Sequence, residues 1–435
     1  MFYDTSIYNG FYAFSLAKKL WKYNRSLTGV GVRQTLGDLK KELPNLKIKS
    51  IPSGKQVFDW TVPKEWHVRE AWIKDQNGNR IIDFKDNNLH LVGYSVPFSG
   101  ILSLKELETH LYSLPDQPDA IPYITSYYKR RWGFCLTHEQ RSSLEKGVYE
   151  VNIDAEHFDG VLNYGELIIP GKSEKEILIS TYICHPMMAN NELSGPTVAT
   201  ALAKWVSEKK QPTLYTYRFI FVPETIGSIS YIADNLDDLR KNTVAGYVLT
   251  CIGDERAYSY LESRLGNTIS DKVAQHCIKH FDHNYSHYSF LARGSDERQY
   301  CSPGVDLPIA SLMRTKYGVY PEYHTSLDTL GDVVTENGLQ GGIELAQRCL
   351  EALEKNKVYK VTCMCEPQLG KRGLYPTLST KESATQTRSM MHILAYSDGN
   401  HSLLDIANII DKPIWELYPI VDSLKQNGLL VEGSE

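Results

Sequence analysis

The chain has 435 residues, of which 42% are hydrophobic and 23% are charged, and its formal net charge is −5. This length allows two or three domains with a large core. The negative charge argues against bulk attraction to nucleic acid or acidic membranes. No run approaches about 18 consecutive apolar residues, and the N-terminus lacks the basic and apolar regions of a secretory signal. We therefore expect a cytoplasmic protein without a membrane span, whose scattered cysteines are reduced thiols.

Two amphipathic helices are predicted near the N-terminus, over residues 8–23 and 32–43. The turn between them holds Arg25, Ser26 and Thr28, which either cap the second helix or line a pocket. On general grounds we expect capping, because short polar side chains at this position accept hydrogen bonds from the first turn of a helix.

From about residue 57 the pattern changes to alternating polar and apolar residues, which is typical of strands. Asn77-Gly78 predicts a tight hairpin turn, and a third strand is predicted over residues 89–96. We interpret residues 57–112 as a small inserted β-rich module. The aromatic and basic segment at 123–132 could stack nucleic-acid bases, but it is short and lies in an acidic protein. We expect it to face a substrate or the core instead.

Strands and helices alternate over the next part of the chain, which predicts a mixed, mostly parallel sheet flanked by helices. Predicted strands are 165–169, 177–183, 217–222, 244–251 and 309–313, and predicted helices lie near 197–208, 228–235, 271–280 and 339–355. The helix near 271–280 begins a run of four histidines, His276, His280, His283 and His287. Histidines one helical turn apart can bind zinc, but we expect a solvated surface helix here.

Three helices are predicted at the C-terminus, over residues 388–396, 402–410 and 413–427, in a pattern that resembles a winged helix-turn-helix. From residue 386 to the end there are three Lys or Arg residues and seven Asp or Glu residues. Because DNA binding depends on positive charge, we expect a module that binds a protein partner or packs, and nucleic acid is not the expected partner.

The residues most suited to catalysis lie where predicted strands end. The strand at 177–183 leads to His185 and then to a polar turn with Asn191 and Glu192, and the strand at 217–222 leads to Glu224. Two histidines and a carboxylate are a plausible zinc set that leaves one position for water. His324 would supply the second histidine, and a further carboxylate would act as base.

The order of these segments resembles the zinc aminopeptidases of the leucyl-aminopeptidase and glutamate-carboxypeptidase kind. The resemblance aligns His185, Ser194-Gly195, Gly227-Ser228, Ser295-Asp296 and the segment from Tyr323-His324-Thr325 to Asp328-Thr329 with that family's motifs. It implies that His185 and His324 bind zinc.

The chain also departs from the zinc-aminopeptidase pattern. Asn191 stands where that family has the aspartate that bridges two zinc ions, and Glu192 follows it. Glu224 stands alone where the family has a Glu-Glu pair. Cys251, with Asp254 after it, replaces an aspartate ligand, and Glu297 replaces a histidine. These changes favour one zinc ion over two.

More closely, the whole chain resembles a bacterial aminopeptidase-like family associated with polysaccharide biosynthesis, on segments such as RSLTGVGVRQTL, STYICHP, NNELSGP and GSDERQYCSPG. The resemblance implies an α/β aminopeptidase-like domain at residues 1–56 and 113–365. It also implies an inserted module like the protease-associated domain at 57–112 and a winged helix at 366–435.

Together these considerations predict a zinc-dependent hydrolase of an amide or peptide bond, with a small peptide, aminoacyl or amino-sugar substrate. The expected site residues are Glu224 and Asp296 for catalysis, His185, His324, Glu224, Asp254 and Asn191 for the metal, and Glu192, Tyr323, Glu297 and Arg298 for the substrate. Two alternatives stay open: a site that binds its ligand without cleaving it, and a regulator acting through the winged helix.

Overall fold

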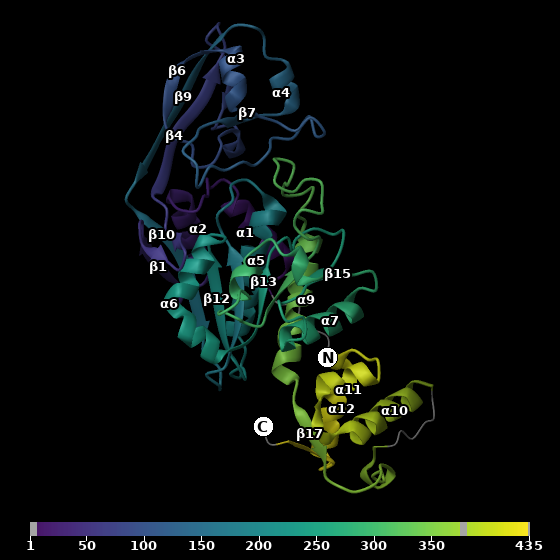
Figure 1. The fold of residues 1–435 in the computed structure, drawn as a ribbon. Helices are drawn as coiled ribbons and strands as arrows, with labels where there is room; N and C mark the ends of the chain where they lie inside the picture. Colours follow the sequence, from purple (N-terminus) through teal and green to yellow (C-terminus); the bar gives the residue numbers. More distant parts are fainter. Residues whose placement is uncertain (1–6, 375–380, 434–435) are drawn as a thin grey trace. The chain divides into compact units, whose positions relative to one another are not determined.

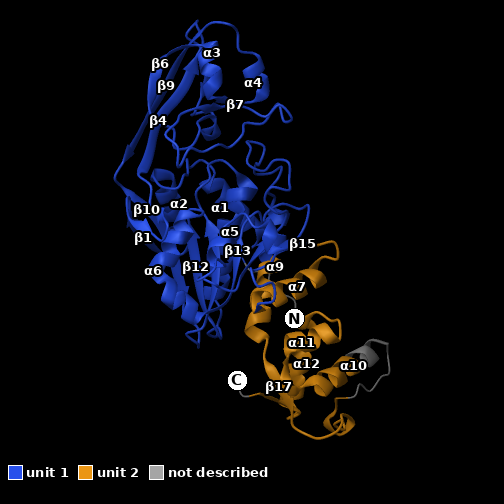
Figure 2. Cartoon of the chain, viewed as in Figure 1, with its two compact units in different colours: residues 1–268, 286–343 blue, residues 269–285, 344–435 orange. Residues whose placement is uncertain are grey.

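The computed structural model describes residues 7–374 and 381–433, which form two compact units (Figures 1 and 2). Unit 1 comprises residues 1–268 and 286–343, and unit 2 comprises residues 269–285 and 344–435. Within the described residues, no helix is both long enough and apolar enough to cross a membrane.

Unit 1 is built around an eight-stranded mixed sheet, which confirms the predicted fold class (Figure 1). The four strands at its centre run parallel, and all five strands predicted in this region are present. In spatial order the strands are β1 (Lys47–Pro52), β10 (Val161–Ile169), β12 (Thr216–Val222), β11 (Glu176–Tyr182), β13 (Thr243–Leu249), β16 (Ile309–Met313), β14 (Ser259–Leu261) and β15 (Ser286–Tyr288).

Helices cover both faces of this sheet. Helix α5 (Ser194–Ser207) connects β11 to β12, and α6 (Ile226–Asn242) connects β12 back past β11 to β13. Because such crossovers are right-handed, connections that run in opposite directions place their helices on opposite faces. The predicted N-terminal helices are also present: α1 (Gly10–Leu20) packs on α5, and α2 (Val30–Glu42) packs on β10.

A close approach of helix and sheet requires glycine at position 195. A Cβ atom there would lie 2.3 Å from Thr181 Oγ1 and 2.4 Å from the Leu249 carbonyl oxygen. Glycine therefore lets α5 begin directly between the ends of β11 and β13. The residues before it, which the sequence predicted as an irregular turn, form a π-helical turn over Ala189–Leu193.

The β-rich module contains a four-stranded sheet in the order β5 (Arg80–Asp83), β4 (Glu65–Lys74), β9 (Val148–Phe158), β6 (Phe98–Ser103). The sheet thus uses residues on both sides of the expected boundary at residue 112, because β4 and β6 both pair with β9. The strand predicted at 89–96 is wrong: Asn87 caps a short 3₁₀ turn there, and Tyr94 has a φ of 64°.

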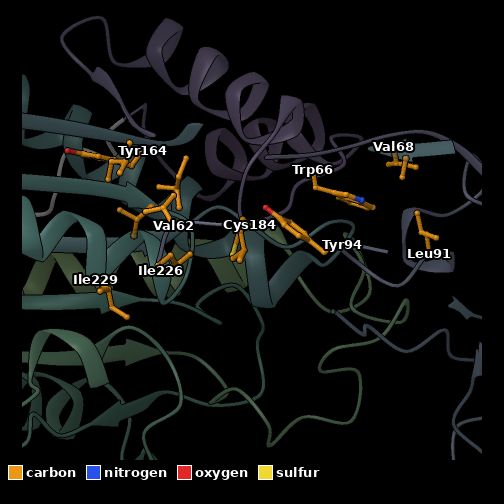
Figure 3. Packing of buried hydrophobic residues seen from close by; sticks show 14 of the residues in the cluster. Val62, Trp66, Val68, Leu91, Tyr94, Tyr164, Cys184, Ile226 and Ile229 are labelled. Atoms are coloured by element: carbon orange, nitrogen blue, oxygen red, sulfur yellow. The ribbon is translucent and has the colours of Figure 1, made fainter. Parts of the chain in front are cut away.

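One hydrophobic cluster joins this module to the main sheet of unit 1 (Figure 3). It includes Val68 and Leu91 from the module, Ile229 from α6, and Trp66 stacked on Tyr94 with ring centroids 5.6 Å apart. The shorter elements of unit 1 are β2 (Gln56–Val57), β3 (Trp60–Thr61), η1 (Asn88–His90), α3 (Leu104–Leu107), η2 (Glu108–His110), β7 (Leu111–Tyr112), β8 (Phe134–Cys135), α4 (His138–Ser142), η4 (Phe290–Ala292) and α8 (Glu297–Tyr300).

Unit 2 contains the three predicted C-terminal helices and a three-stranded sheet in the order β18-β17-β19. The expected winged-helix range, 366–435, includes residues 375–380, which lie outside the described residues. The elements are α7 (Ile269–Phe281), the last part of α9 (Glu336–Lys355), β17 (Val358–Val361), η5 (Gly370–Arg372), α10 (Lys381–Tyr396), β18 (Asp398–Ser402), α11 (Leu403–Ile409), α12 (Ile414–Gln426) and β19 (Leu430–Glu432).

His276 joins α7 to the winged-helix part of unit 2. Its Nδ1 lies 2.6 Å from Asn408 Oδ1, and its Nε2 accepts the Ile414 backbone N–H at 2.9 Å. It therefore satisfies one of the free N–H groups at the start of α12. Since the side chain is buried, the expectation of a solvated surface helix is wrong at this position.

We predict that the free energy of unfolding of unit 2 decreases as the pH is lowered, because His276 must stay neutral in the folded protein. Burial lowers the pKa of His276 from 6.5 to about 4. The contribution of His276 to stability is fully present above the pKa of His276 in the unfolded chain. It is lost as the pH falls through the pKa of the folded protein, since between the two values only the unfolded chain takes up a proton. His276→Ala should cost about 1–3 kcal/mol at neutral pH and flatten this dependence. Hydrogen exchange of the α12 amides, followed as a function of pH, measures this stability. The control is His283→Ala, at an exposed histidine. If the stability of His276→Ala depends on pH as steeply as that of the parent protein, His276 is not the titrating group.

Candidate functional site

Three parallel strands deliver polar residues to one edge of the main sheet. His185 follows β11, Glu224 follows β12 and Asp254 follows β13, each within a few residues of the strand end. This carboxyl edge of a parallel sheet is where α/β proteins bind ligands. The remaining candidate residues lie in two further segments: Asp296, Glu297 and Arg298 in residues 294–300, and Tyr323 and His324 in residues 315–329.

A buried chain of three residues fixes the His185 ring. Arg25 donates from Nε to the His185 carbonyl oxygen at 2.9 Å, and the same atom lies 3.3 Å from Glu192 Oε1. The other Glu192 oxygen, Oε2, lies 2.9 Å from His185 Nδ1. The side chains of Arg25 and Glu192 have no exposed surface. A carboxylate on Nδ1 fixes the tautomer in which Nε2 carries the lone pair.

His185 Nε2 faces Glu224, with 3.6 Å between Nε2 and Oε2. Burial, reinforced by the charge of Arg25, lowers the pKa of His185 to about 3, so the ring is neutral and can act as a ligand. Burial, and next the charge of Asp296, raise the pKa of Glu224 to about 8. A carboxyl group with this pKa can hold or release a proton near neutral pH.

His324 lies beside His185, with ring centroids 5.6 Å apart. Its backbone is in the left-handed region, with a φ of 58°. Its ring stacks on Tyr323 at 3.9 Å, and the edge of Tyr123 contacts both histidines. His324 Nε2 is buried and has no hydrogen-bond partner among the described residues. Burial lowers the pKa of His324 to about 3, so this nitrogen is also a free donor to a cation.

Asn191 carries a second unsatisfied atom and is linked to this region through Tyr182, whose ring lies 5.2 Å from that of His185. The π-helical turn is held by Asp328, whose two oxygens accept the backbone N–H groups of Asn190 and Asn191 at 2.7 and 2.9 Å. The Asn191 amide donates from Nδ2 to the Tyr182 hydroxyl at 2.8 Å. Its Oδ1 is buried and, within the described part of the chain, unpartnered. An amide oxygen can bind a metal ion, but it carries no charge.

The structure gives Asp254 a different environment from the one expected of a ligand. Its carboxylate accepts four hydrogen bonds, from Asn190 Nδ2, the Arg256 backbone, and the backbone and hydroxyl of Thr315. These bonds use its lone pairs and tie the turn after β13 to Asn190. Asp254 therefore holds the frame of the site together rather than facing His185.

Asp296 and Arg298 brace the backbone that presents Glu224. Thr225 has a φ of 66°, which is strained for a β-branched residue. Its N–H donates to Asp296 Oδ1 at 2.7 Å, and its hydroxyl accepts from Arg298 at 2.6 Å. The second Asp296 oxygen and Arg298 Nε are buried without partners among the described residues. Glu297, expected to bind substrate, is held by Tyr317 and the backbone of residues 294 and 295.

The described residues contain one tight group of three possible metal ligands, Cys184, His185 and Glu192. Cys184 and Glu192 both lie on the Nδ1 side of the His185 ring, and the Cys184 sulfur is 3.8 Å from Nδ1. Burial raises the pKa of the Cys184 thiol well above its usual range and that of Glu192 to about 8, and Arg25 Nε lies 3.3 Å from Glu192 Oε1. The group therefore orients His185, and the open ligand atoms lie on the other side of the ring.

Among the expected residues, the structure thus brings together His185, His324 and Glu224, with Asn191 beside them. Sequence reasoning misplaced Arg25: the α2 N-cap is Gly29 without a side-chain cap, and Arg25 instead pairs with Glu192. It also did not predict that Tyr123 contacts both histidines. The RSLTG and TSYYKRRW segments were the available signals, but neither spacing nor periodicity links them to His185.

Comparisons with known proteins agree with the fold, although their boundary at residues 356–357 falls within unit 2. Residues 14–356 match the family model described as a domain of unknown function, DUF4910, and residues 357–432 match a winged helix-turn-helix model. A Clostridium acetobutylicum protein named as a candidate polysaccharide biosynthesis protein with an aminopeptidase-like domain is 43% identical over 91% of this chain and 90% of its own.

Solved structures extend these similarities. A crystal structure of a candidate peptidase from Clostridium acetobutylicum has a TM-score of 0.91 and 41% identity, covering 97% of this chain and 96% of its own. BSAP, a zinc aminopeptidase from Bacillus subtilis, has a TM-score of 0.59 at 12% identity over 80% of this chain and 95% of its own, which is a similarity of fold. The chain therefore belongs to the DUF4910 family, in which it joins an aminopeptidase-like fold to a C-terminal winged helix-turn-helix.

Proposed function

We propose that this protein is a zinc-dependent hydrolase that cleaves an amide or peptide bond of a small peptide, aminoacyl or amino-sugar substrate. The observation that carries the proposal is a pair of adjacent neutral histidines: His185 Nε2 lies 3.6 Å from Glu224, and His324 Nε2 is buried without a partner among the described residues. Two histidines and a glutamate are a donor set that suits catalytic zinc.

By their donor types, the residues at this edge of the sheet suit one zinc ion. His185 and His324 would donate Nε2, Glu224 a carboxylate oxygen, and Asn191 its neutral Oδ1. The buried, unpartnered Nε2 of His324 and Oδ1 of Asn191 support this assignment, because buried polar atoms are normally satisfied. The zinc ion, when bound, polarises the scissile carbonyl and lowers the pKa of water.

The protein's own groups then orient the substrate and move the proton. Tyr123 and Tyr323 flank the histidines and exclude water from one side of the site. With its raised pKa, Glu224 can accept a proton from the attacking water and return it to the leaving amine. Glu224 acts either as this base or as the third metal ligand, and the zinc content of Glu224→Gln separates the two roles.

One observation favours a second function, in which the site binds an aminoacyl or amino-sugar ligand without cleaving it. Asn191 is neutral, and Asp254 and Glu297 are fully engaged in holding the frame. Among the described residues, Glu224 would then be the one carboxylate that faces His185, and it would have to serve as both ligand and base. Turnover of any amide substrate by the zinc-loaded protein excludes this alternative.

We expect about one zinc ion per chain after purification without chelators. His185→Ala/His324→Ala should abolish zinc binding, because both nitrogen donors are lost. Metal analysis by mass spectrometry measures the content. The matched control is His283→Ala/His287→Ala, which removes two histidines elsewhere. A metal-free parent protein, or full zinc content in the His185/His324 variant, contradicts the metal site.

Glu224→Gln should lower kcat on aminoacyl amides and short peptides by about 10²- to 10⁴-fold, since the amide cannot take up the proton. If Glu224 is the base, zinc content stays at the parent level; if it is the third ligand, zinc content falls as well. Glu322→Gln, at an ion pair with Arg256, is the control and should keep full activity. A Glu224→Gln variant as active as the parent would remove Glu224 from the mechanism.

Arg25 and Glu192 should matter for zinc affinity beyond their effect on folding. Arg25→Met leaves Glu192 buried and unpaired, which should cost about 3–5 kcal/mol of unfolding free energy. In Arg25→Met/Glu192→Leu the stability should return, because neither buried charge remains. Zinc affinity should nevertheless stay about 10- to 100-fold weaker, because His185 Nδ1 has lost its acceptor. Denaturant unfolding and zinc titration measure the two quantities; parent-like zinc affinity in the double variant would show a purely structural role.

A further inference from the structure

A cavity in unit 1 is lined by residues other than those assigned to zinc. Its volume is about 480 Å³, which is within the usual range for small-molecule sites. It is formed by the loop before β4, the loop at residues 94–96, the segment at 126–130 and the end of β9. The segment at 126–130 belongs to the aromatic and basic stretch that the sequence singled out and the proposed hydrolase does not use.

The cavity has an excess of positive charge. Lys64, Lys129 and Arg130 line it together with a single acid, Asp159, which pairs with Lys64 at 3.3 Å. Among the described residues, neither the Lys129 ammonium nor the Arg130 guanidinium has an ion-pair or hydrogen-bond partner. The neighbouring Arg131 differs, because it donates to the Thr125 carbonyl oxygen at 2.8 Å. Two cations are thus left free at the cavity.

Aromatic rings form the other part of the lining. Tyr94 and Tyr127 meet edge to face with ring centroids 5.1 Å apart, and Tyr94 is buried. Tyr128 is 62% exposed, yet its ring is supported by Trp60 at 5.4 Å. An exposed ring held by a neighbour offers a surface on which a planar or ring-shaped ligand can lie.

His157 completes the lining, with its ring 5.7 Å from that of Tyr94. Burial lowers its pKa, and the charges of Arg130 and Lys64 lower it further. The neutral ring is therefore a hydrogen-bond group, and the positive charge of the cavity resides on the lysines and the arginine.

Free cations next to ring faces suit a ligand that has both a negative charge and a ring. Arg and Lys bind phosphate oxygens through charge-assisted hydrogen bonds, while aromatic faces bind ring systems. We propose that this cavity binds a phosphate ester of a ring-bearing compound, with Lys129 and Arg130 on the phosphate and Tyr128 on the ring. The two sources of this chemistry are sugar phosphates and nucleotides.

The test titrates the full-length protein with glucose 1-phosphate, uridine diphosphate, inorganic phosphate and glucose by calorimetry. We expect saturable binding of glucose 1-phosphate or uridine diphosphate that weakens with salt, and at least about tenfold weaker binding of inorganic phosphate and glucose. Whichever ester binds more tightly identifies the source. Equal binding of inorganic phosphate, or no saturation by either ester up to about 10 mM, overturns the proposal.

Variants locate the binding. Lys129→Ala/Arg130→Ala should weaken binding of the phosphate ester at least about tenfold, and Tyr128→Ala should weaken it by about threefold or more. The control Lys85→Ala/Lys105→Ala removes two exposed lysines from the same module and should change affinity less than about twofold. All these side chains are exposed, so the fold should persist, which the thermal unfolding midpoint checks. Equal affinity in the Lys129/Arg130 variant and this control overturns the proposal. Because zinc plays no part in the binding, the result is independent of the hydrolase assignment.

Discussion

The site depends on the buried pair of Arg25 and Glu192. Two charges without exposed surface are costly unless each is paired and hydrogen-bonded, and here both conditions are met through His185. The pair connects the N-terminal segment, the π-helical turn and the end of β11. It thereby converts a strand-end histidine into a neutral ring with a fixed direction, which is the state that a metal ligand requires.

Four of the nine non-glycine residues with positive φ in the described part of the chain lie around the same site. Met187, Thr225, Cys251 and His324 are non-glycine residues with positive φ, between 41° and 66°, and all follow strands or lie in the loops that close the site. Such conformations cost about 1–3 kcal/mol each and persist only when the surrounding contacts hold them. For Thr225 those contacts are Asp296 and Arg298, so residues that the sequence suggested for catalysis and substrate binding also determine where Glu224 lies.

Much of the fold could be predicted from the sequence because apolar runs and helical periodicity are local properties. The five strands predicted for the main sheet are present and helices lie where they were predicted, although α6 extends to Asn242, beyond its predicted end at residue 235. The strand expected at residues 89–96 failed because the side chain of Asn87 and the φ of Tyr94 form a turn within an apolar stretch. The π-helical turn was missed because its hydrogen bonds come from Asp328, far along the chain.

The sequence by itself determined that His185 and Glu224 lie where strands end, because each follows an apolar run, and it singled out His324 by its motif, although His324 lies in the loop between β16 and α9. It also determined the acidic winged helix. Only the tertiary structure decided which carboxylates remain free: Asp254 and Glu297 are saturated with hydrogen bonds, Glu192 pairs with Arg25, and Glu224 faces His185. The physical reason is that the availability of a carboxylate depends on donors brought from distant segments, and residue spacing does not reveal them.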